Sequence, residues 1–193
     1  MPVIRAFIAL ELPKQIYQSL DQVISQLKNR LVGSAIRWTP ADNIHLTLKF
    51  LGEISTTNVE ILEKLLRAEA AGCSHFEISI GGLGAYPTIH NPRVIWVGVE
   101  APSDLINLQR LIEAATERLG YMKEDRPFSA HLTLGRVSRS AAPRDARLIG
   151  EVLESTKVGF LGAAHIGAVY LFKSDLRTTG SIYTKIYSAP LRD

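Results

Sequence analysis

The chain has 193 residues, of which 46% are hydrophobic and 21% are charged, and its formal net charge is +3. This length predicts one compact domain or two closely joined lobes, and the composition excludes a disordered, collagen-like or low-complexity chain. The single cysteine, Cys73, excludes an internal disulfide, and no apolar run reaches the ~18 to 20 residues that cross a bilayer. We therefore expect a cytoplasmic protein that has no membrane partner.

Hydrophobic periodicity predicts strands and helices that alternate along the chain, as in a mixed α+β fold. The predicted strands span residues 5–11, 44–52, 76–83, 94–99, 128–137, 165–172 and 181–187. The predicted helices begin at Pro13, Thr57, Ser103 and Asp145 and end at about Gly33, Ala71, Gly120 and Ser155. Residues 57–60 have the form of a capping box, and Ser103 is a typical N-cap residue.

The order of these elements occurs twice. A strand, a helix, a loop and a strand with the sequence His-Leu-Thr-Leu run from residue 3 to 51 and again from 94 to 137, and a helix follows each time. Two copies are too few for a solenoid, which needs at least about three to bury its faces. We therefore expect a single bilobal domain, with pseudo-repeats at about 1–90 and 91–193 that face one another.

The repeated His-Leu-Thr-Leu sequence is the candidate for chemistry. In a strand, His45 and Thr47 point to one face while the two leucines point to the other, and the same holds for His131 and Thr133. The leucines can anchor each strand in a core, so that the imidazoles and hydroxyls line a groove. One imidazole can then act as a base and the other, protonated, as an acid, while the hydroxyls donate hydrogen bonds to an anion. This pattern suits phosphodiester cleavage without a metal.

Three other kinds of site are less consistent with the sequence. Two histidines could bind a metal, but a catalytic zinc needs a third protein ligand, and neither motif has a carboxylate or cysteine on the same strand face. No Gly-x-Ser-x-Gly segment supports a serine nucleophile. Residues 81–84, Gly-Gly-Leu-Gly, lack the spacing and lysine of a phosphate-binding loop, so we expect a bulge or bend there. We expect Cys73 to be a buried thiol.

The sequence resembles the 2H phosphoesterases, a superfamily named for two His-x-Thr motifs, and within it the RNA 2′,3′-cyclic phosphodiesterases first described as 2′-5′ RNA ligases. The resemblance rests on residues 5–12, 45–52, 83–87, 126–136 and 171–174 and on Tyr183. It implies a bilobal fold with an antiparallel sheet in each lobe, helices outside and an active-site cleft in the centre.

The resemblance also implies a role for each motif residue. His45 would be the proton donor and His131 the proton acceptor, Thr47 and Thr133 would bind phosphate oxygens, and Arg136 would contact the nucleotide. The implied reaction opens RNA 2′,3′-cyclic phosphates to 2′-phosphates, and its reverse would join tRNA halves through a 2′-5′ linkage. We expect a monomer that needs no metal or cofactor and whose partner is RNA with cyclic phosphate ends.

The alternation of side chains between the two faces of a strand makes further predictions for the residues that follow the motifs. It places Lys49 on the face of His45 and Thr47, and Phe50 in the core with the leucines. It places Arg136 on the leucine face, so that Arg136 reaches the cleft only if its strand ends or bulges at Gly135. Two alternative functions stay open, a small cyclic-nucleotide phosphodiesterase of the same superfamily and a non-catalytic protein that binds RNA ends.

Overall fold

The computed structural model describes residues 2–178 and 180–193, which form two antiparallel sheets and four α-helices. The first sheet has the strand order β3-β1-β8-β9, with β1 at Val3–Leu10, β3 at Leu46–Ser55, β8 at Ala168–Arg177 and β9 at Gly180–Pro190. The second sheet has the order β2-β6-β5-β4-β7, with β2 at Ile36–Trp38, β4 at Phe76–Thr88, β5 at Asn91–Glu100, β6 at His131–Val137 and β7 at Phe160–Ile166. The expected α+β fold with two antiparallel sheets is confirmed.

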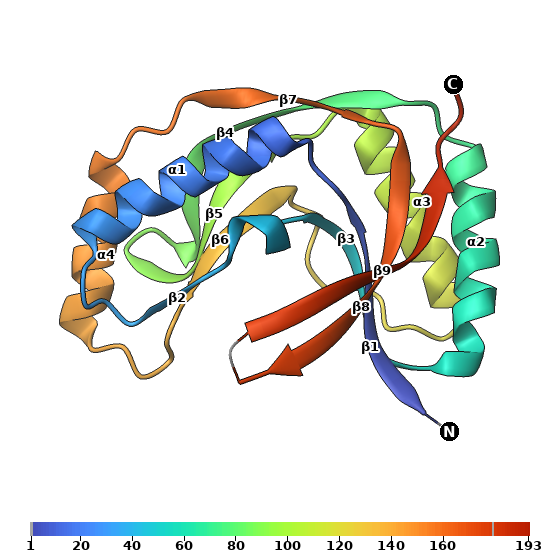
Figure 1. Cartoon of the computed structure of the whole chain (residues 1–193), viewed down its shortest axis with the longest axis horizontal. Coiled ribbons are helices and arrows are strands. Elements are labelled where there is room, and N and C mark those ends of the chain that lie inside the picture. The colour runs from blue at the N-terminus through green and yellow to red at the C-terminus, as the bar shows by residue number, and fades with distance from the viewer. Residues whose placement is uncertain (1, 179) are drawn as a thin grey trace.

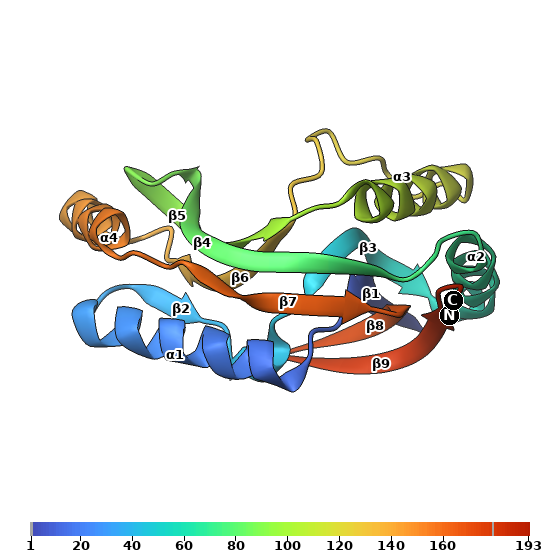
Figure 2. The ribbon, with the colours of Figure 1, turned by 90° about the horizontal axis from the view of Figure 1, so that it is seen from above.

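Each sheet is the centre of one lobe, and Figure 1 shows the two lobes side by side. The helices α2 (Val59–Ala71) and α3 (Ser103–Arg118) pack on the first sheet, and α1 (Lys14–Arg30) and α4 (Pro143–Ser155) pack on the second. Figure 2 shows the same division of the helices from above. The helix α1 follows β1 in the chain but covers the other sheet, so the two lobes are linked by more than one crossing of the chain.

The two sheets draw their strands from both parts of the chain. The repeated pairs occupy equivalent places, because β3 lies beside β1 in the first sheet and β6 lies beside β5 in the second. However, β4 joins the second sheet, and β8 and β9 return to the first. The lobes therefore have different boundaries from the sequence repeats at 1–90 and 91–193.

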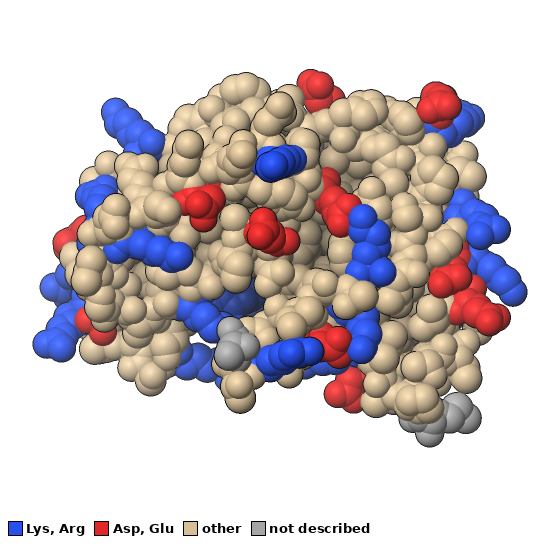
Figure 3. All heavy atoms as spheres, in the orientation of Figure 1, with Lys and Arg blue, Asp and Glu red and all other residues tan. Residues whose placement is uncertain are grey.

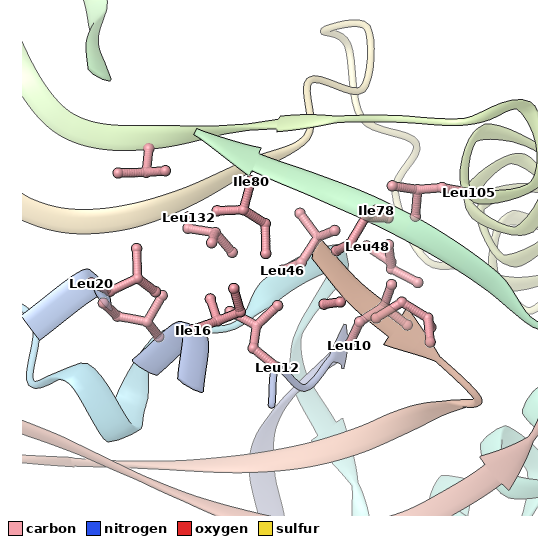
Figure 4. Close-up of a cluster of buried hydrophobic side chains, with 14 of the residues drawn as sticks. Leu10, Leu12, Ile16, Leu20, Leu46, Leu48, Ile78, Ile80, Leu105 and Leu132 are labelled. Carbon is pink, nitrogen blue, oxygen red and sulfur yellow. The ribbon is translucent and has the colours of Figure 1, made fainter. Parts of the chain in front are cut away.

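The larger of two hydrophobic core clusters in the described residues connects the two sheets. Leu46 and Leu48 of the first motif and Leu132 and Leu134 of the second are all buried in it. Figure 4 shows Leu46, Leu48 and Leu132 among side chains from both lobes, including Ile78 from β4. Burying each such side chain stabilises the fold by roughly 1.5 to 3 kcal/mol, so the leucine faces hold both motifs in fixed positions.

Several predicted elements differ from the structure. The strand β2 was not predicted, because three residues are too short to show periodicity. The expected strand at 165–172 is two strands, β7 and β8, which belong to different sheets. The expected capping box at 57–60 is absent: the N–H of Thr57 donates to the Oγ of Ser55, residues 56–58 form a 3₁₀ turn, and α2 begins at Val59. Ser103 lies inside α3, after Pro102 at its N-cap.

Candidate active site

Both motif histidines lie at the beginning of a strand and are held in the same way. His45 directly precedes β3, and its Nδ1 donates to the carbonyl oxygen of Asn43 at 2.9 Å. His131 is the first residue of β6, and its Nδ1 donates to the carbonyl oxygen of Ser129 at 2.7 Å. Since a carbonyl oxygen only accepts, Nδ1 carries the hydrogen in both rings, and Nε2 holds the lone pair when the ring is neutral. Each Nε2 can therefore accept a proton or, once protonated, donate one.

The motif threonines lie two residues further along each strand. Thr47 is opposite Ala9 of β1, Thr133 is opposite Trp96 of β5, and both threonines are half-buried. Neither hydroxyl has a hydrogen-bond partner within the part of the chain that the structure describes, so both can donate to a bound anion. The strands β3 and β6 contact each other across the lobes, which places the two motifs at the junction of the sheets (Figure 1).

Aromatic side chains surround the imidazole of His45. The ring of Phe7 stacks on it with centroids 4.5 Å apart, and the ring of Tyr183 meets it edge-on at 5.1 Å. Burial lowers the pKa of His45 from 6.5 to about 4, although the hydrogen bond to Asn43 acts in the opposite direction. His45 is therefore neutral at pH 7 in the free protein.

Aromatic side chains of the second sheet surround the imidazole of His131 in a similar arrangement. Tyr86 of β4 meets the imidazole edge-on at 5.1 Å, and Trp96 of β5 lies 6.4 Å away. The hydroxyl of Tyr86 also hydrogen-bonds to the hydroxyl of Ser129, whose carbonyl holds His131. The indole of Trp96 lies directly over Gly84, where a Cβ would be 2.3 Å from the ring. Each histidine thus has one aromatic ring from the neighbouring strand and one edge-on tyrosine.

A β-bulge in β6 brings Arg136 to the face of the motif. Trp96 is opposite Thr133 and Val94 is opposite Arg136, so two steps along β5 correspond to three steps along β6, and Leu134 is the extra residue. Trp96 and Val94 share a face of β5, and Arg136 therefore shares the face of Thr133. A regular strand would place Arg136 on the leucine face, but the bulge formed by Leu134 and Gly135 meets the stated condition for Arg136 to reach the motif face.

The equivalent bulge in β3 reverses both predictions for Lys49 and Phe50. Ala9 is opposite Thr47 and Ile8 is opposite Lys49, so Leu48 is the extra residue. Lys49 consequently lies in the core with 1% of its surface exposed, and its Nζ pairs with Glu113 at 2.5 Å. Phe50 is not a core residue: it shares the face of Thr47 and is 57% exposed.

Arg37 is a candidate binding residue that the sequence analysis missed. It lies on β2 directly opposite Arg136, and both side chains are exposed. With Ser34 and Ser138, the two arginines line a hollow of about 410 Å³. None of the ion pairs in the described ranges includes either arginine, and like charges directly opposite repel each other, so an anion between them would be stabilising. No sequence signal could pair these arginines, because β2 was not predicted.

A second hollow lies beside His45 and has a volume of about 180 Å³. Its lining includes Asn43, Tyr183 and the ion pair between Lys185 and Glu11, whose Nζ and Oε2 are 2.6 Å apart. Figure 3 shows that lysine and arginine side chains are frequent over α4 and β2 on this face of the molecule. Polar groups of both signs thus lie near His45, whereas the hollow beside β6 has only arginines as charged groups in its lining.

The remaining sequence candidates have structural roles. Cys73 is buried, and burial raises the pKa of its thiol. Residues 81–84 form the expected bulge, with Gly82 at a φ of 75°. Within residues 2–178 and 180–193, no group of three His, Cys, Asp or Glu side chains could hold a metal ion. No helix in these ranges is long and apolar enough to cross a membrane.

Comparisons with known proteins point to one family. The family model described as LigT like phosphoesterase matches residues 10–96. The RNA 2′,3′-cyclic phosphodiesterase of Methanothermobacter thermautotrophicus is 31% identical over 94% of this chain and 95% of its own. That of Escherichia coli is 33% identical over 71% of this chain and 74% of its own. Among solved structures, TT0787 of Thermus thermophilus has a TM-score of 0.81 at 24% identity and covers 98% of each chain. Escherichia coli LigT in complex with 3′-AMP has a TM-score of 0.78 at 24% identity and covers both chains fully.

Proposed function

This chain belongs to the LigT-like phosphoesterases, the family of the RNA 2′,3′-cyclic phosphodiesterases, and we propose that it hydrolyses RNA 2′,3′-cyclic phosphates to 2′-phosphates by paired-histidine catalysis. The proposed mechanism rests on one observation. Two imidazoles from different sheets are fixed by the same backbone hydrogen bond, and each leaves its Nε2 available for proton transfer. An acid and a base on opposite sides of a phosphate are what the in-line opening of a cyclic diester requires.

The proposed step transfers two protons and exchanges one bond at phosphorus. The Nε2 of His131 takes a proton from water, whose oxygen attacks the phosphorus atom. The bond from phosphorus to the 3′ oxygen breaks, and the Nε2 of His45 gives a proton to that oxygen. The hydroxyls of Thr47 and Thr133 donate to the non-bridging oxygens, where negative charge increases.

Because the pKa of His45 is low, we propose that its ring becomes protonated, and so able to act as the acid, only when the substrate binds. In the free protein the imidazole is neutral at pH 7, because burial disfavours its charged form. A phosphate anion beside the ring favours the charged form by Coulomb attraction, and exclusion of water strengthens this attraction. His45 therefore takes up a proton when the substrate binds and releases it to the 3′ oxygen.

We further propose that Arg136, together with Arg37, binds RNA phosphates beside the reaction centre. The reverse reaction, with a 5′-hydroxyl in place of water, uses the same side chains by microscopic reversibility, so ligation of tRNA halves is a side activity. The catalytic unit is a monomer, because one chain supplies both histidines and both threonines.

The proposed reaction is tested by phosphorus NMR of the product formed from a cyclic-phosphate oligoribonucleotide in the presence of EDTA. A 2′-phosphate formed over many turnovers supports the proposal. A 3′-phosphate, or a requirement for added metal, would refute it. A protein that only binds RNA ends would give no turnover, and a small-nucleotide phosphodiesterase would prefer a cyclic mononucleotide to a cyclic-phosphate trinucleotide.

A further inference from the structure

Lys49 is a buried charged residue that the proposed mechanism does not use. It lies two residues after Thr47 on β3, and among the residues that the structure describes it is the only charged side chain that is buried. Burial of an ammonium group is costly, and replacing a buried ion pair with apolar side chains of similar volume is often neutral or stabilising. The stability of the fold therefore does not by itself account for a lysine at this position.

The partners of Lys49 hold the loop that links α3 to β6, which Figure 2 shows. The Nζ of Lys49 pairs with the carboxylate of Glu113 on α3 and donates to the carbonyl oxygen of Met122. The same carboxylate accepts the N–H of Glu124 at 3.0 Å. Residues 122–127 are all exposed, and within the described part of the chain these two bonds are the only hydrogen bonds that they make. The buried pair therefore anchors this part of the loop.

The anchored loop leads directly to the second histidine motif. Near its end, the carbonyl oxygen of Ser129 accepts the Nδ1 hydrogen of His131 at 2.7 Å. The bond between the hydroxyls of Tyr86 and Ser129 holds the side chain of Ser129, whereas the residues before Ser129 set the direction in which the chain enters it. If this carbonyl shifted, the hydrogen of the imidazole would divide between its two nitrogens. The position of the loop therefore determines whether the Nε2 of His131 keeps its lone pair.

The buried pair is also joined to the first motif. Lys49 belongs to the motif strand itself, and the amide of Gln109 on α3 donates at 3.4 Å both to Glu113 and to the carbonyl oxygen of Leu48, the extra residue of the bulge. One network of hydrogen bonds thus runs from the first motif to the loop that holds the second. A fixed distance between the motifs matters for catalysis, because a misplacement of about 1 Å can lower a rate by about 100-fold.

We propose that Lys49 and Glu113 are positioning residues, which hold the loop before the second motif so that His131 is aimed at the substrate. This inference rests on the proposed function, in which His131 takes the proton from water. Both side chains lie between β3 and α3 and act through the carbonyl of Ser129, so neither of them touches the substrate.

The first test separates positioning from stability. Lys49→Met leaves a largely buried carboxylate without its partner, so it should lower both the melting temperature and kcat. Lys49→Met/Glu113→Leu replaces both charges with apolar side chains, so the melting temperature should return close to that of the wild type. Nothing in this double variant binds Met122 or Glu124, and kcat for a cyclic-phosphate oligoribonucleotide should remain about 10- to 100-fold below the wild type, with KM nearly unchanged.

The second test observes the imidazoles directly. Nitrogen-15 NMR of the neutral rings distinguishes a hydrogen on Nδ1 from a hydrogen on Nε2. Both motif histidines of the wild type should have the Nδ1–H form. In the double variant, His131 should become a mixture of the two forms, whereas His45, which the carbonyl of Asn43 holds, should stay as in the wild type.

The matched control is Lys173→Met/Asp175→Leu, which removes a partly exposed pair on β8 and should change neither kcat nor either ring. All variants are measured well below the lowest melting temperature. A double variant of Lys49 and Glu113 with wild-type kcat, or with His131 still in the Nδ1–H form, would overturn the inference, and so would an equal change in both rings. If the wild type turned over no cyclic phosphate, the proposed function would fail, while the NMR comparison would still show whether the buried pair holds His131.

Discussion

The charge state of the His45 imidazole depends on its burial in the fold. Its pKa of about 4 in the free protein reflects burial beside Phe7, Phe172 and Tyr183. We expect the ring resonances of His45 to titrate near pH 4 in NMR spectra of the free protein. Addition of inorganic phosphate should raise this pKa, because the anion favours the charged ring. A free pKa at or above 6.5, or no change with phosphate, would contradict the mechanism.

The lowered pKa of His45 also makes the stability of the fold depend on pH. The unfolded chain binds a proton at His45 below about pH 6.5, whereas the folded protein does so only below about pH 4. The stabilisation from neutral His45 is therefore complete above pH 6.5 and is lost as pH falls from 6.5 to 4, on the order of 3 kcal/mol in total. Urea unfolding over this range should show a steeper loss for the wild type than for His45→Gln. Parallel curves would show that His45 does not carry this dependence.

The motif threonines allow an isosteric test. Thr47→Val and Thr133→Val keep the β-branched shape that suits a strand, so both variants should fold with unchanged melting temperature. Each should lower kcat/KM by about 10- to 150-fold, since a hydrogen bond to a charged group contributes about 1.5 to 3 kcal/mol. A folded variant with wild-type kcat/KM would show that its hydroxyl does not bind the phosphate.

In the strands β3 and β6, two bulges explain which side-chain orientations the sequence predicts correctly and which it does not. The period of two placed His45, Thr47 and the leucines correctly, because it holds for the first four residues of the motif. The period of two does not hold at Lys49, Phe50 and Arg136, because an extra residue at the fourth position of the motif inverts the side chains that follow it, in β3 as far as the next register shift after Phe50. The local sequence does not fix the position of such a bulge, since the bulge depends on the register of pairing with β1 and β5. Long amphipathic helices were predictable for the opposite reason, as their pattern is local.

The buried pair of Lys49 and Glu113 joins three elements. Lys49 of β3 pairs with Glu113 of α3 and also donates to the carbonyl of Met122, and Glu113 accepts the N–H of Glu124. Lys49→Met leaves the carboxylate of Glu113 largely buried without its partner, and we expect a loss of about 3 to 5 kcal/mol in the free energy of unfolding. The partly exposed pair of Lys173 and Asp175 is the control, where Lys173→Met should cost less than about 1 kcal/mol. Urea unfolding curves measure both, and equal costs would contradict this role.

The paired arginines of β2 and β6 make a prediction about RNA binding. Arg136→Ala and Arg37→Ala should each raise KM for a cyclic-phosphate oligoribonucleotide and reduce the slope of log affinity against log salt by about 0.7. Arg144→Ala should change neither, because the side chain of Arg144 is 90% exposed and, among the described residues, its ion pair is with the adjacent Asp145. Steady-state kinetics at several salt concentrations measure both quantities. Equal effects of Arg144→Ala and Arg136→Ala would place RNA recognition elsewhere.

For the whole molecule, we propose that the two lobes form one cooperative domain. The core cluster includes side chains from both sheets, and α1 crosses from one lobe to the other. Both tryptophans, Trp38 and Trp96, lie in the second sheet, so their fluorescence reports on that lobe, while far-UV circular dichroism reports on both. The two thermal transitions should coincide within error. A fluorescence transition that precedes or follows the circular dichroism transition would show that the lobes unfold separately.

For the pair of lobes as a whole, we propose that one histidine from each lobe meets the substrate at a shared site, where the two act as an acid and base pair. The most direct test is the turnover of a cyclic-phosphate oligoribonucleotide by His45→Ala, His131→Ala and the double variant. Each single variant should lose about 100- to 10,000-fold in kcat, and the double variant should be little worse than the weaker single variant, because residues that act as a unit are not additive. A single variant that keeps more than half of the wild-type turnover would contradict the claim.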